Sequence, residues 1–111
     1  MFSFEKDAIK RATEKLKEIL GDNLIEVAAF GSRVRGDFDG DSDFDILIVV
    51  KKRTSDVIDK AIDIFTDEED KMGIPFSVVI KEIKSFEKER AYNTTFYRNI
   101  KREGVVFYGQ I

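Results

Sequence analysis

A short run of five apolar residues, Ile46–Val50, constrains the fold of this chain more than any other feature. The run contains no polar residue, so an extended segment here must be buried on both of its faces. A strand of that kind lies inside a sheet that is covered on both sides. We therefore expect an α/β (α+β) fold in which a mixed sheet of three to four strands is covered by helices.

Apolar periodicity and chain breakers predict the other elements. Helices are expected at Phe4–Leu20, from Thr54 or Ser55 to about Glu69, from Ser85 onward, and from Thr94 or Thr95 to Glu103. Strands are expected at Leu24–Phe30, Asp43–Val50, Phe76–Ile80 and Val105–Tyr108. No linker or internal repeat interrupts the pattern, so residues 1–111 are expected to form a single domain.

Helical spacing also predicts which side chains face the core. The first two long helices are expected to bury Ile9, Ala12, Leu16, Ile19 and Leu20, and Val57, Ile58, Ala61, Ile62 and Phe65. In the last helix Phe96 and Ile100 lie four residues apart, so both are expected to pack inward. Tyr97 and Arg98 are expected to be exposed.

Two carboxylates, Asp43 and Asp45, open the apolar run. Side chains in a strand alternate between faces, so these two project to the same side while Phe44 points the other way. Two neighbouring carboxylates suit Mg²⁺, which takes the rest of its coordination shell from water and substrate phosphate. The pair is therefore a candidate metal and catalytic site.

A Gly-Ser turn with two arginines precedes the carboxylates. Gly31 allows the backbone to approach a phosphate closely, and Ser32 adds a hydroxyl donor. Arg33 and Arg35 carry a permanent charge and can bind phosphate oxygens with two donors each. If the segment is helical, Ser32 and Arg35 share a face. In either conformation at least one arginine reaches the phosphate side, which indicates chemistry on a nucleoside triphosphate.

The acidic stretch between these motifs has two further interpretations. Asp37, Asp39 and Asp41 alternate as in a calcium-binding loop, but Gly40 has the wrong spacing. Ile48 also occupies the position where such a loop needs a closing glutamate. A solvated turn rich in Asp and Gly explains the segment better than calcium binding does.

Composition excludes several kinds of chemistry. The chain has no cysteine and no histidine, so disulfides, zinc–thiolate sites, thiol catalysis and imidazole catalysis are excluded. No run is long enough for a membrane span, and the absence of cysteine fits a cytoplasmic protein. The net charge of −3 argues against binding to template nucleic acid through the domain itself.

The ordered motifs resemble a known signature. Gly31-Ser32-x-Val34-Arg35-Gly36 followed by Ser42-Asp43-x-Asp45-Ile46-Leu47 is similar to the signature of the DNA polymerase β-like nucleotidyltransferase superfamily, in particular its minimal nucleotidyltransferases. The resemblance implies a nucleotidyltransferase-like core in which Gly31 and Ser32 hold the β- and γ-phosphates. It also implies that Asp43 and Asp45 ligate two Mg²⁺ ions and that Arg35 steadies the triphosphate.

The chain departs from the family at the third strand, where relatives carry another carboxylate. The matching position is Ser77, and a serine replaces a carboxylate neither as a base nor as a strong Mg²⁺ ligand. Glu82 is the nearest carboxylate downstream. It faces the opposite side from Ser77 if the strand continues regularly, unless a bend redirects it.

The resemblance implies transfer of AMP from ATP to an acceptor, with a small helical HEPN-type protein as partner in a toxin–antitoxin pair. The alternative is a binding or neutralising subunit with little activity. The acceptor is expected to dock from outside the domain, and a homo- or hetero-oligomer is compatible with this. The residues of the tail weighed for acceptor docking are Tyr92, Phe96, Tyr97, Arg98 and Phe107.

Overall fold

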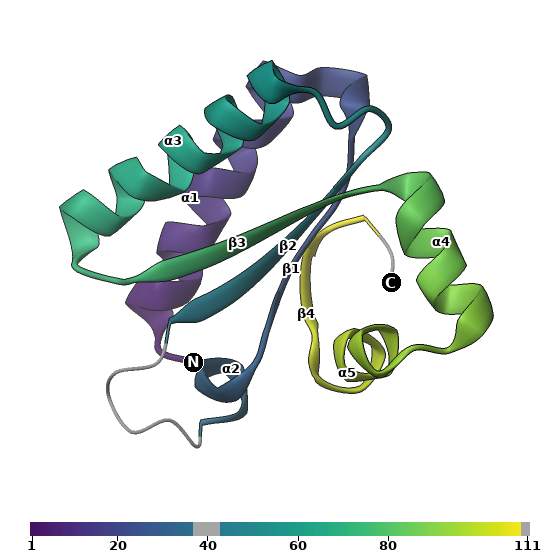
Figure 1. Cartoon of the computed structure of the whole chain (residues 1–111). Helices are drawn as coiled ribbons and strands as arrows, with labels where there is room; N and C mark the ends of the chain where they lie inside the picture. The colour runs from purple at the N-terminus through teal and green to yellow at the C-terminus, as the bar shows by residue number, and fades with distance from the viewer. Residues whose placement is uncertain (37–42, 110–111) are drawn as a thin grey trace.

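Four strands form one mixed sheet in the order β3-β2-β1-β4 (Figure 1). They are β1 (Leu24–Phe30), β2 (Phe44–Val50), β3 (Phe76–Glu82) and β4 (Val105–Tyr108). β1 is antiparallel to both of its neighbours, β2 and β4, and β2 is parallel to β3. The structure is a computed structural model, and it describes residues 1–36 and 43–109.

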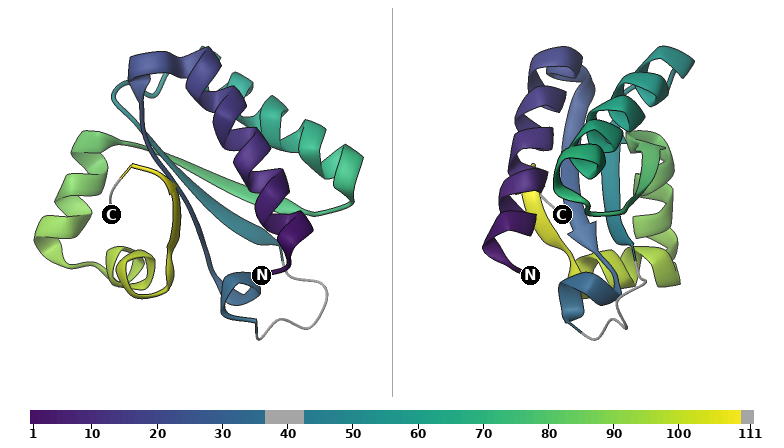
Figure 2. Two further views of the ribbon diagram at one scale, coloured as in Figure 1. Left: turned by 180° about the vertical axis from the view of Figure 1, so that it is seen from behind. Right: turned by 90° about the vertical axis from the view of Figure 1, so that its left-hand side faces the viewer.

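Helices cover both faces of the sheet (Figure 2). α1 (Ser3–Leu20) and α3 (Ser55–Met72) pack on one face, and α4 (Ile83–Tyr92) and α5 (Thr95–Glu103) lie on the other. A single helical turn, α2 (Ser32–Arg35), follows β1, and a short 3₁₀ turn, η1 (Gly21–Asn23), precedes it. The mixed sheet covered by helices confirms the fold class expected from the sequence.

The apolar run in β2 is fully buried, as its composition predicted. Ile46, Ile48 and Val50 join the core under α1 and α3. Leu47 and Val49 point the other way and pack with residues of α4 and α5. This central strand therefore holds the two helical layers together.

The expected boundaries differ from the observed ones at several ends. β1 and β4 have the predicted bounds, whereas β2 begins at Phe44, one position after Asp43. α3 continues to Met72, where Gly73 ends it in the left-handed region. β3 continues to Glu82, and α4 then begins at Ile83 without a loop, ahead of the expected Ser85.

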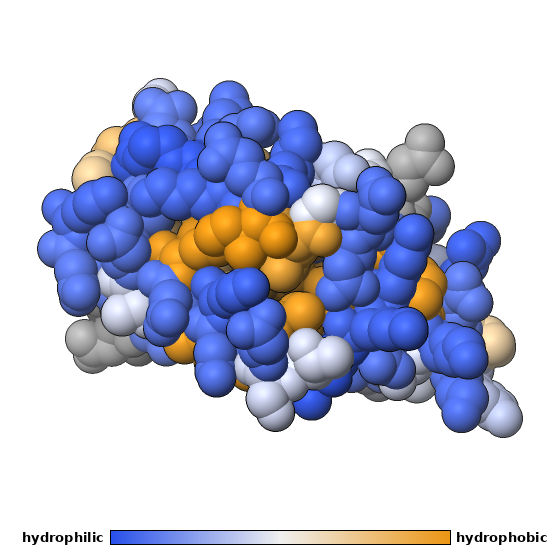
Figure 3. Space-filling view, turned by 90° about the horizontal axis from the view of Figure 1, so that it is seen from above, coloured by the Kyte–Doolittle hydropathy of each residue, from blue (hydrophilic) through white to orange (hydrophobic). Residues whose placement is uncertain are grey.

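Two residues expected in the core are exposed. Ile19 and Ile62 lie at the borders of their apolar stripes, and the helices turn them outward. Ile64 and Glu68 instead face inward from α3, and the buried Glu68 carboxylate accepts hydrogen bonds from Arg11 of α1 at 2.9 and 3.1 Å. On the side seen in Figure 3, a band of hydrophobic residues is bordered by hydrophilic ones. Between α1 and α3, Ile19 and Ile64 line a hollow of about 270 Å³.

A second buried acid, Glu26, forms no ion pair of this kind within the described part of the chain. The Glu26 side chain of β1 belongs to a residue that is 7% exposed, and among the described residues its Oε2 atom accepts no hydrogen bond. Burial raises the pKa of Glu26, and the positive charge of Arg90 opposes this only in part. The folded protein therefore holds a proton on Glu26 more tightly than the unfolded chain does.

We expect Glu26→Gln to raise the melting temperature at pH 7. The folded-state pKa lies above the ordinary value of 4.5, so the wild-type protein loses stability as the pH rises from 4.5 through the folded-state pKa. The variant carries an uncharged amide at this position, so its stability does not fall in this way as the pH rises. Thermal unfolding from pH 4 to pH 8 should show a difference that shrinks toward pH 4. Glu18→Gln, on the exposed side of α1, is the control and should follow the wild type at each pH.

Candidate functional site

Gly31 and Asp45 are in close contact where β1 ends beside β2. The antiparallel register places Phe30 opposite Asp45, so the chain leaves β1 directly against the carboxylate. Gly31 has a φ of +89°, and a Cβ built there would overlap Asp45 Oδ2 and lie 3.1 Å from Asp45 Cγ. Glycine is therefore required both by the backbone conformation and by the space that Asp45 occupies.

The turn after Gly31 is helical, which settles the conformation that the sequence left open. The Arg35 amide donates to the Gly31 carbonyl at 3.2 Å, and the Gly36 amide donates to the Ser32 carbonyl at 2.9 Å. Ser32 and Arg35 thus lie on one face of α2. Gly36 ends the turn in the left-handed region.

Asp43 and Asp45 flank a buried ring. Phe44 is fully buried, and its amide donates to the Pro75 carbonyl at 2.9 Å, which fixes the start of β2 against β3. Alternation then sends Asp45 to the same face as Leu47, on the side of α4 and α5. Asp43 is exposed just before the strand.

The electrostatics of the carboxylate pair suit a divalent cation. The pKa of Asp45 is raised. Burial is the largest cause and the negative charge of Asp43 adds to it, whereas the positive charge of Arg35 lowers the pKa. A divalent ion beside both carboxylates would neutralise this repulsion, and Mg²⁺ needs only one or two such ligands besides phosphate and water. Within residues 1–36 and 43–109 no group of three or more acidic, cysteine or histidine side chains is suited to a metal ion. The donor set therefore fits a metal that binds together with a phosphate substrate.

The two arginines lie in different surroundings. The Arg33 side chain is 12% exposed, and its guanidinium contacts the Glu5 carboxylate at 3.0 Å and lies 4.7 Å from the centre of the Phe44 ring. That position is on the α1 side of the sheet, away from Asp45. The Arg35 side chain is 43% exposed and pairs with Glu103 of α5 at 2.7 Å. Arg35 is thus the arginine that shares a side with the carboxylates.

Glu5 and Glu103 are partners that the sequence interpretation missed. Each is far from its arginine in the sequence, so no local motif connects them. The pKa of Glu103 is lowered by its hydrogen bonds to Arg35 and Arg102. A negatively charged Glu103 is therefore bound to the guanidinium of Arg35, the group that the sequence analysis assigns to the triphosphate.

The register between β2 and β3 places Ser77 beside Asp45 and Glu82 at the far end of the strand. Ser77 lies directly opposite Asp45, where the family's third carboxylate was expected. Glu82 lies opposite Val50 at the other end of the strand, and it accepts a hydrogen bond from the Arg53 amide at 2.9 Å. Glu82 was considered as a substitute only if the strand bent, and β3 instead continues through it.

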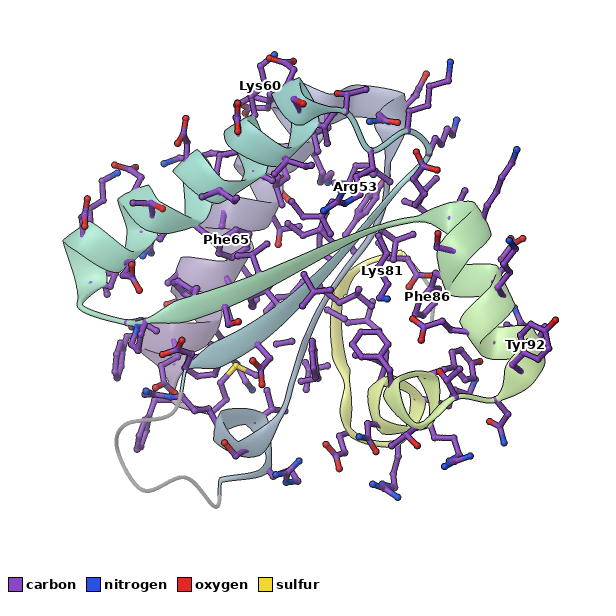
Figure 4. The ribbon with its side chains drawn as sticks, in the orientation of Figure 1. Arg53, Lys60, Phe65, Lys81, Phe86 and Tyr92 are labelled. Atoms are coloured by element: carbon purple, nitrogen blue, oxygen red, sulfur yellow. The ribbon has the colours of Figure 1, made fainter. Side chains whose placement is uncertain are left out.

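The residues of the tail differ in their exposure. Phe96 packs on Phe30 with ring centres 5.6 Å apart, and Ile100 is buried, as predicted. Tyr97 was expected to be exposed but is half-buried, because its ring lies against Phe86 at 5.7 Å. Arg98 is exposed, and Tyr92 projects from the end of α4 (Figure 4).

The calcium-loop alternative, with Asp37, Asp39, Gly40 and Asp41, falls outside the described residues, as does Ser42 of the motif. In the part of the chain that is described, no helix is long and apolar enough to span a membrane.

Comparison with known proteins decides the family. The sequence model of the nucleotidyltransferase domain matches residues 9–106. The chain belongs to the nucleotidyltransferase domain family. A candidate protein adenylyltransferase of Methanocaldococcus jannaschii is 35% identical over 105 residues, which cover 94% of this chain and 98% of that protein. The chain is a nucleotidyltransferase, as the motifs predicted.

Two solved structures have the same fold. A toxin–antitoxin structure with AMP-PNP is 16% identical with a TM-score of 0.59, and the match covers 91% of this chain and 73% of that chain. A structure of a tri-AMPylated HEPN toxin of Shewanella oneidensis with its MNT antitoxin is 14% identical with a TM-score of 0.53. That match covers 91% of this chain and 70% of the other.

We expect Gly31→Ala to reduce nucleotidyl transfer by about 100-fold or more, because the new methyl group displaces Asp45 from its position. Gly36→Ala is the matched control. Gly36 also has a positive φ, +84°, but a Cβ there meets no atom of residues 1–36 or 43–109 within 4 Å. Both variants should lose about 1 kcal/mol of stability to backbone strain. Equal activities in the two variants would contradict a role for the contact between Gly31 and Asp45.

Proposed function

We propose that residues 1–111 form one domain that transfers AMP from ATP to a hydroxyl group of a protein, with divalent metal bound at Asp43 and Asp45. The observation that carries this proposal is the contact between Gly31 and Asp45. It brings a loop suited to phosphate within reach of a carboxylate pair suited to a metal. This contact supports the proposal that the two halves act as one site.

The residues have separate tasks in this reaction. Gly31 and Ser32 bind the β- and γ-phosphates, and Arg35 exchanges its contact with Glu103 for the triphosphate. Arg33 is the remaining candidate for nucleotide binding, and its contacts with Glu5 and Phe44 support the α2 turn from the other face of the sheet. Asp43 and Asp45 hold up to two Mg²⁺ ions when the triphosphate is present.

Transfer requires one bond to form and another to break. The acceptor oxygen bonds to the α-phosphorus, and the bond from that phosphorus to the bridging oxygen of the β-phosphate breaks. Pyrophosphate leaves, and the hydroxyl proton passes to water or to a group on the acceptor. A bound divalent ion supplies charge neutralisation for the transferring phosphate. The protein's own contribution is to position the triphosphate against Asp45.

The names of the relatives support the choice of nucleotide and acceptor. The archaeal relative is named for protein adenylylation, and the two solved structures are of toxin–antitoxin proteins, one with AMP-PNP and one with an AMPylated HEPN toxin. We infer that the acceptor is a HEPN-type protein and that this chain is the antitoxin of the pair. The reaction would take place in the cytoplasm.

The second candidate function is a binding subunit that neutralises its partner without efficient transfer. Ser77 favours this reading, because it occupies the row of Asp45 and supplies no carboxylate. The two functions differ in whether the bound nucleotide is consumed.

We expect the double variant Asp43→Asn/Asp45→Asn to lose about 1,000-fold or more of its transfer activity, because it no longer binds the metal beside the phosphate. The measurement is transfer of α-phosphate-labelled ATP to protein in a lysate of the source organism with Mg²⁺ or Mn²⁺. Circular dichroism confirms that the variant is folded. A protein labelled equally by both forms would refute the carboxylate assignment. Labelling by neither form, with nucleotide still bound, would favour the binding subunit.

Ser77→Asp separates the two functions further. If the missing carboxylate limits the reaction, the variant should transfer AMP about tenfold faster or more, because an added base contributes at least that much. Ser77→Asn is the control, since asparagine has nearly the same size as aspartate but carries no charge. Equal rates in both variants would show that the base comes from the acceptor.

A further inference from the structure

The outer edge of β3 is an unpaired strand edge. β3 is the last strand on its side of the sheet, and in Figure 1 it is the front strand. No helix or loop among the described residues crosses in front of it in that view. An open edge of this kind presents unpaired backbone donors and acceptors to any extended chain.

The hydrogen bonds between β2 and β3 show which backbone groups face outward. The Phe44 amide donates to the Pro75 carbonyl at 2.9 Å, and Phe44 lies opposite Phe76. In a parallel pair only alternate residues of each strand direct their groups to the neighbour. Residues 75, 77, 79 and 81 therefore bond to β2, and Phe76, Val78 and Ile80 direct their backbone groups outward.

Side chains cap both ends of this outward row. Glu69 accepts from the Phe76 amide at 3.1 Å, and Arg53 Nε donates to the Ile80 carbonyl at 2.8 Å. Figure 4 shows Arg53 beside the upper part of β3. Four outward backbone groups lie between the caps: the carbonyl of Phe76, the amide and the carbonyl of Val78, and the amide of Ile80. They match an added strand of about five residues that pairs around Val78.

Between these two caps the edge lacks the protection that isolated proteins use. Phe76 to Ile80 include no charged residue and no proline, and their register with β2 contains no bulge, although open edges are commonly guarded by one of these. Next to the edge, on the α3 side, lies a hollow of about 200 Å³. It is lined by Ile62, Phe65, Thr66, Glu69, Phe76 and Val78. Ile62 is 45% exposed there, so an apolar side chain can be received.

The same edge leads to the candidate active site. Ser77 and Asp45 lie in one row of the sheet and face the same side. A residue opposite Ser77 on an added strand continues that row, about 10 Å from Asp45 at two strand spacings. That gap leaves room for a metal-bound phosphate between Asp45 and an acceptor hydroxyl.

The charge of α3 selects among the possible occupants. This helix contains seven acidic and two basic residues and lies along the edge. Two copies of the chain joined edge to edge would bring two acidic helices together, which is unfavourable. A segment with basic residues beside its apolar ones is complementary.

We propose that the outer edge of β3 docks the acceptor protein through an extended segment, which pairs with Val78 as a fifth strand. The segment places an apolar side chain against Ile62 on one face of the sheet. On the other face it presents its hydroxyl residue in the row of Ser77 and Asp45. The inference rests on the proposed function, since it names how the protein acceptor reaches that site.

Val78→Pro tests the backbone pairing. It removes the outward amide, whereas the bonds to β2 belong to residues 77 and 79, so the sheet keeps its ladder. Val78→Thr retains the amide and the branched shape and is the matched control. The probe is the acceptor protein that becomes labelled in the lysate assay. For Val78→Pro, kcat/KM for this acceptor should fall about tenfold or more, with unchanged ATP affinity, and Val78→Thr should stay near the wild type.

Wild-type kinetics in a folded Val78→Pro variant would overturn the proposal, and so would a wild-type dimer that this variant dissociates. If Val78→Pro fails to fold, Ile62→Glu replaces it. That substitution lies on the exposed side of α3 and should raise KM for the acceptor with little change in kcat, whereas an unchanged KM would overturn the proposal.

A peptide separates failure of docking from failure of the proposed function. If the wild type labels no protein, the transfer proposal fails and the edge is tested alone. The probe is then a short synthetic peptide with alternating valines, a central tyrosine and a lysine at each end. It should slow hydrogen exchange at the Val78 and Ile80 amides, and the same peptide with N-methylated valines should not. Unchanged exchange at millimolar peptide would overturn the docking site.

Discussion

The contact between Gly31 and the Asp45 carboxylate is the constraint on which the rest of the site depends. It exists because β1 and β2 are antiparallel and in a register that ends β1 opposite Asp45. A shift of one residue would turn Asp45 toward the core under α1 and remove it from the loop. Phe44 fixes the face on which Asp45 lies, because its fully buried ring belongs to the core under α1 and α3 and side chains alternate along the strand. Core packing thus sets the site geometry, and a substitution at Gly31 acts on Asp45 directly.

The sequence predicted the features that depend on local pattern. The two-sided burial of Ile46–Val50 and the bounds of β1 and β4 follow from spacing and composition. Ser77 was singled out by the resemblance to the family, and it lies opposite Asp45. Features that depend on distant residues were missed. The pairs Glu5–Arg33 and Arg35–Glu103 join segments that no motif connects. Ile62 was placed in the core because it is apolar, although the helix turns it toward the open edge of β3. The roles of the site residues in nucleotide binding remain predictions.

Two properties of β3 bear on how this domain works as a nucleotidyltransferase. It carries Ser77 where a third carboxylate is expected, and its outer edge is open beside that position. A domain that completes its site only with the acceptor in place gains specificity, because nucleotide bound without the acceptor meets no positioned base. In the proposed reaction the pair between Arg35 and Glu103 acts in the same direction, since the triphosphate would have to displace the carboxylate that Arg35 already binds. Under the proposed function, both features would restrain turnover until nucleotide and acceptor are present together.

The central claim, that the metal–nucleotide complex binds beside the adjoining Gly31 and Asp45, is tested most directly by nuclear magnetic resonance with a paramagnetic ion. Mn²⁺ replaces Mg²⁺ together with a non-hydrolysable ATP analogue, and the broadening of each backbone amide signal is measured. We predict strong broadening at Gly31, Ser32 and Asp45, and little at Val50 and Glu82, which lie at the opposite end of the sheet. Equal broadening at both ends, or broadening confined to Glu82 and the adjoining residues of α4, would contradict the site.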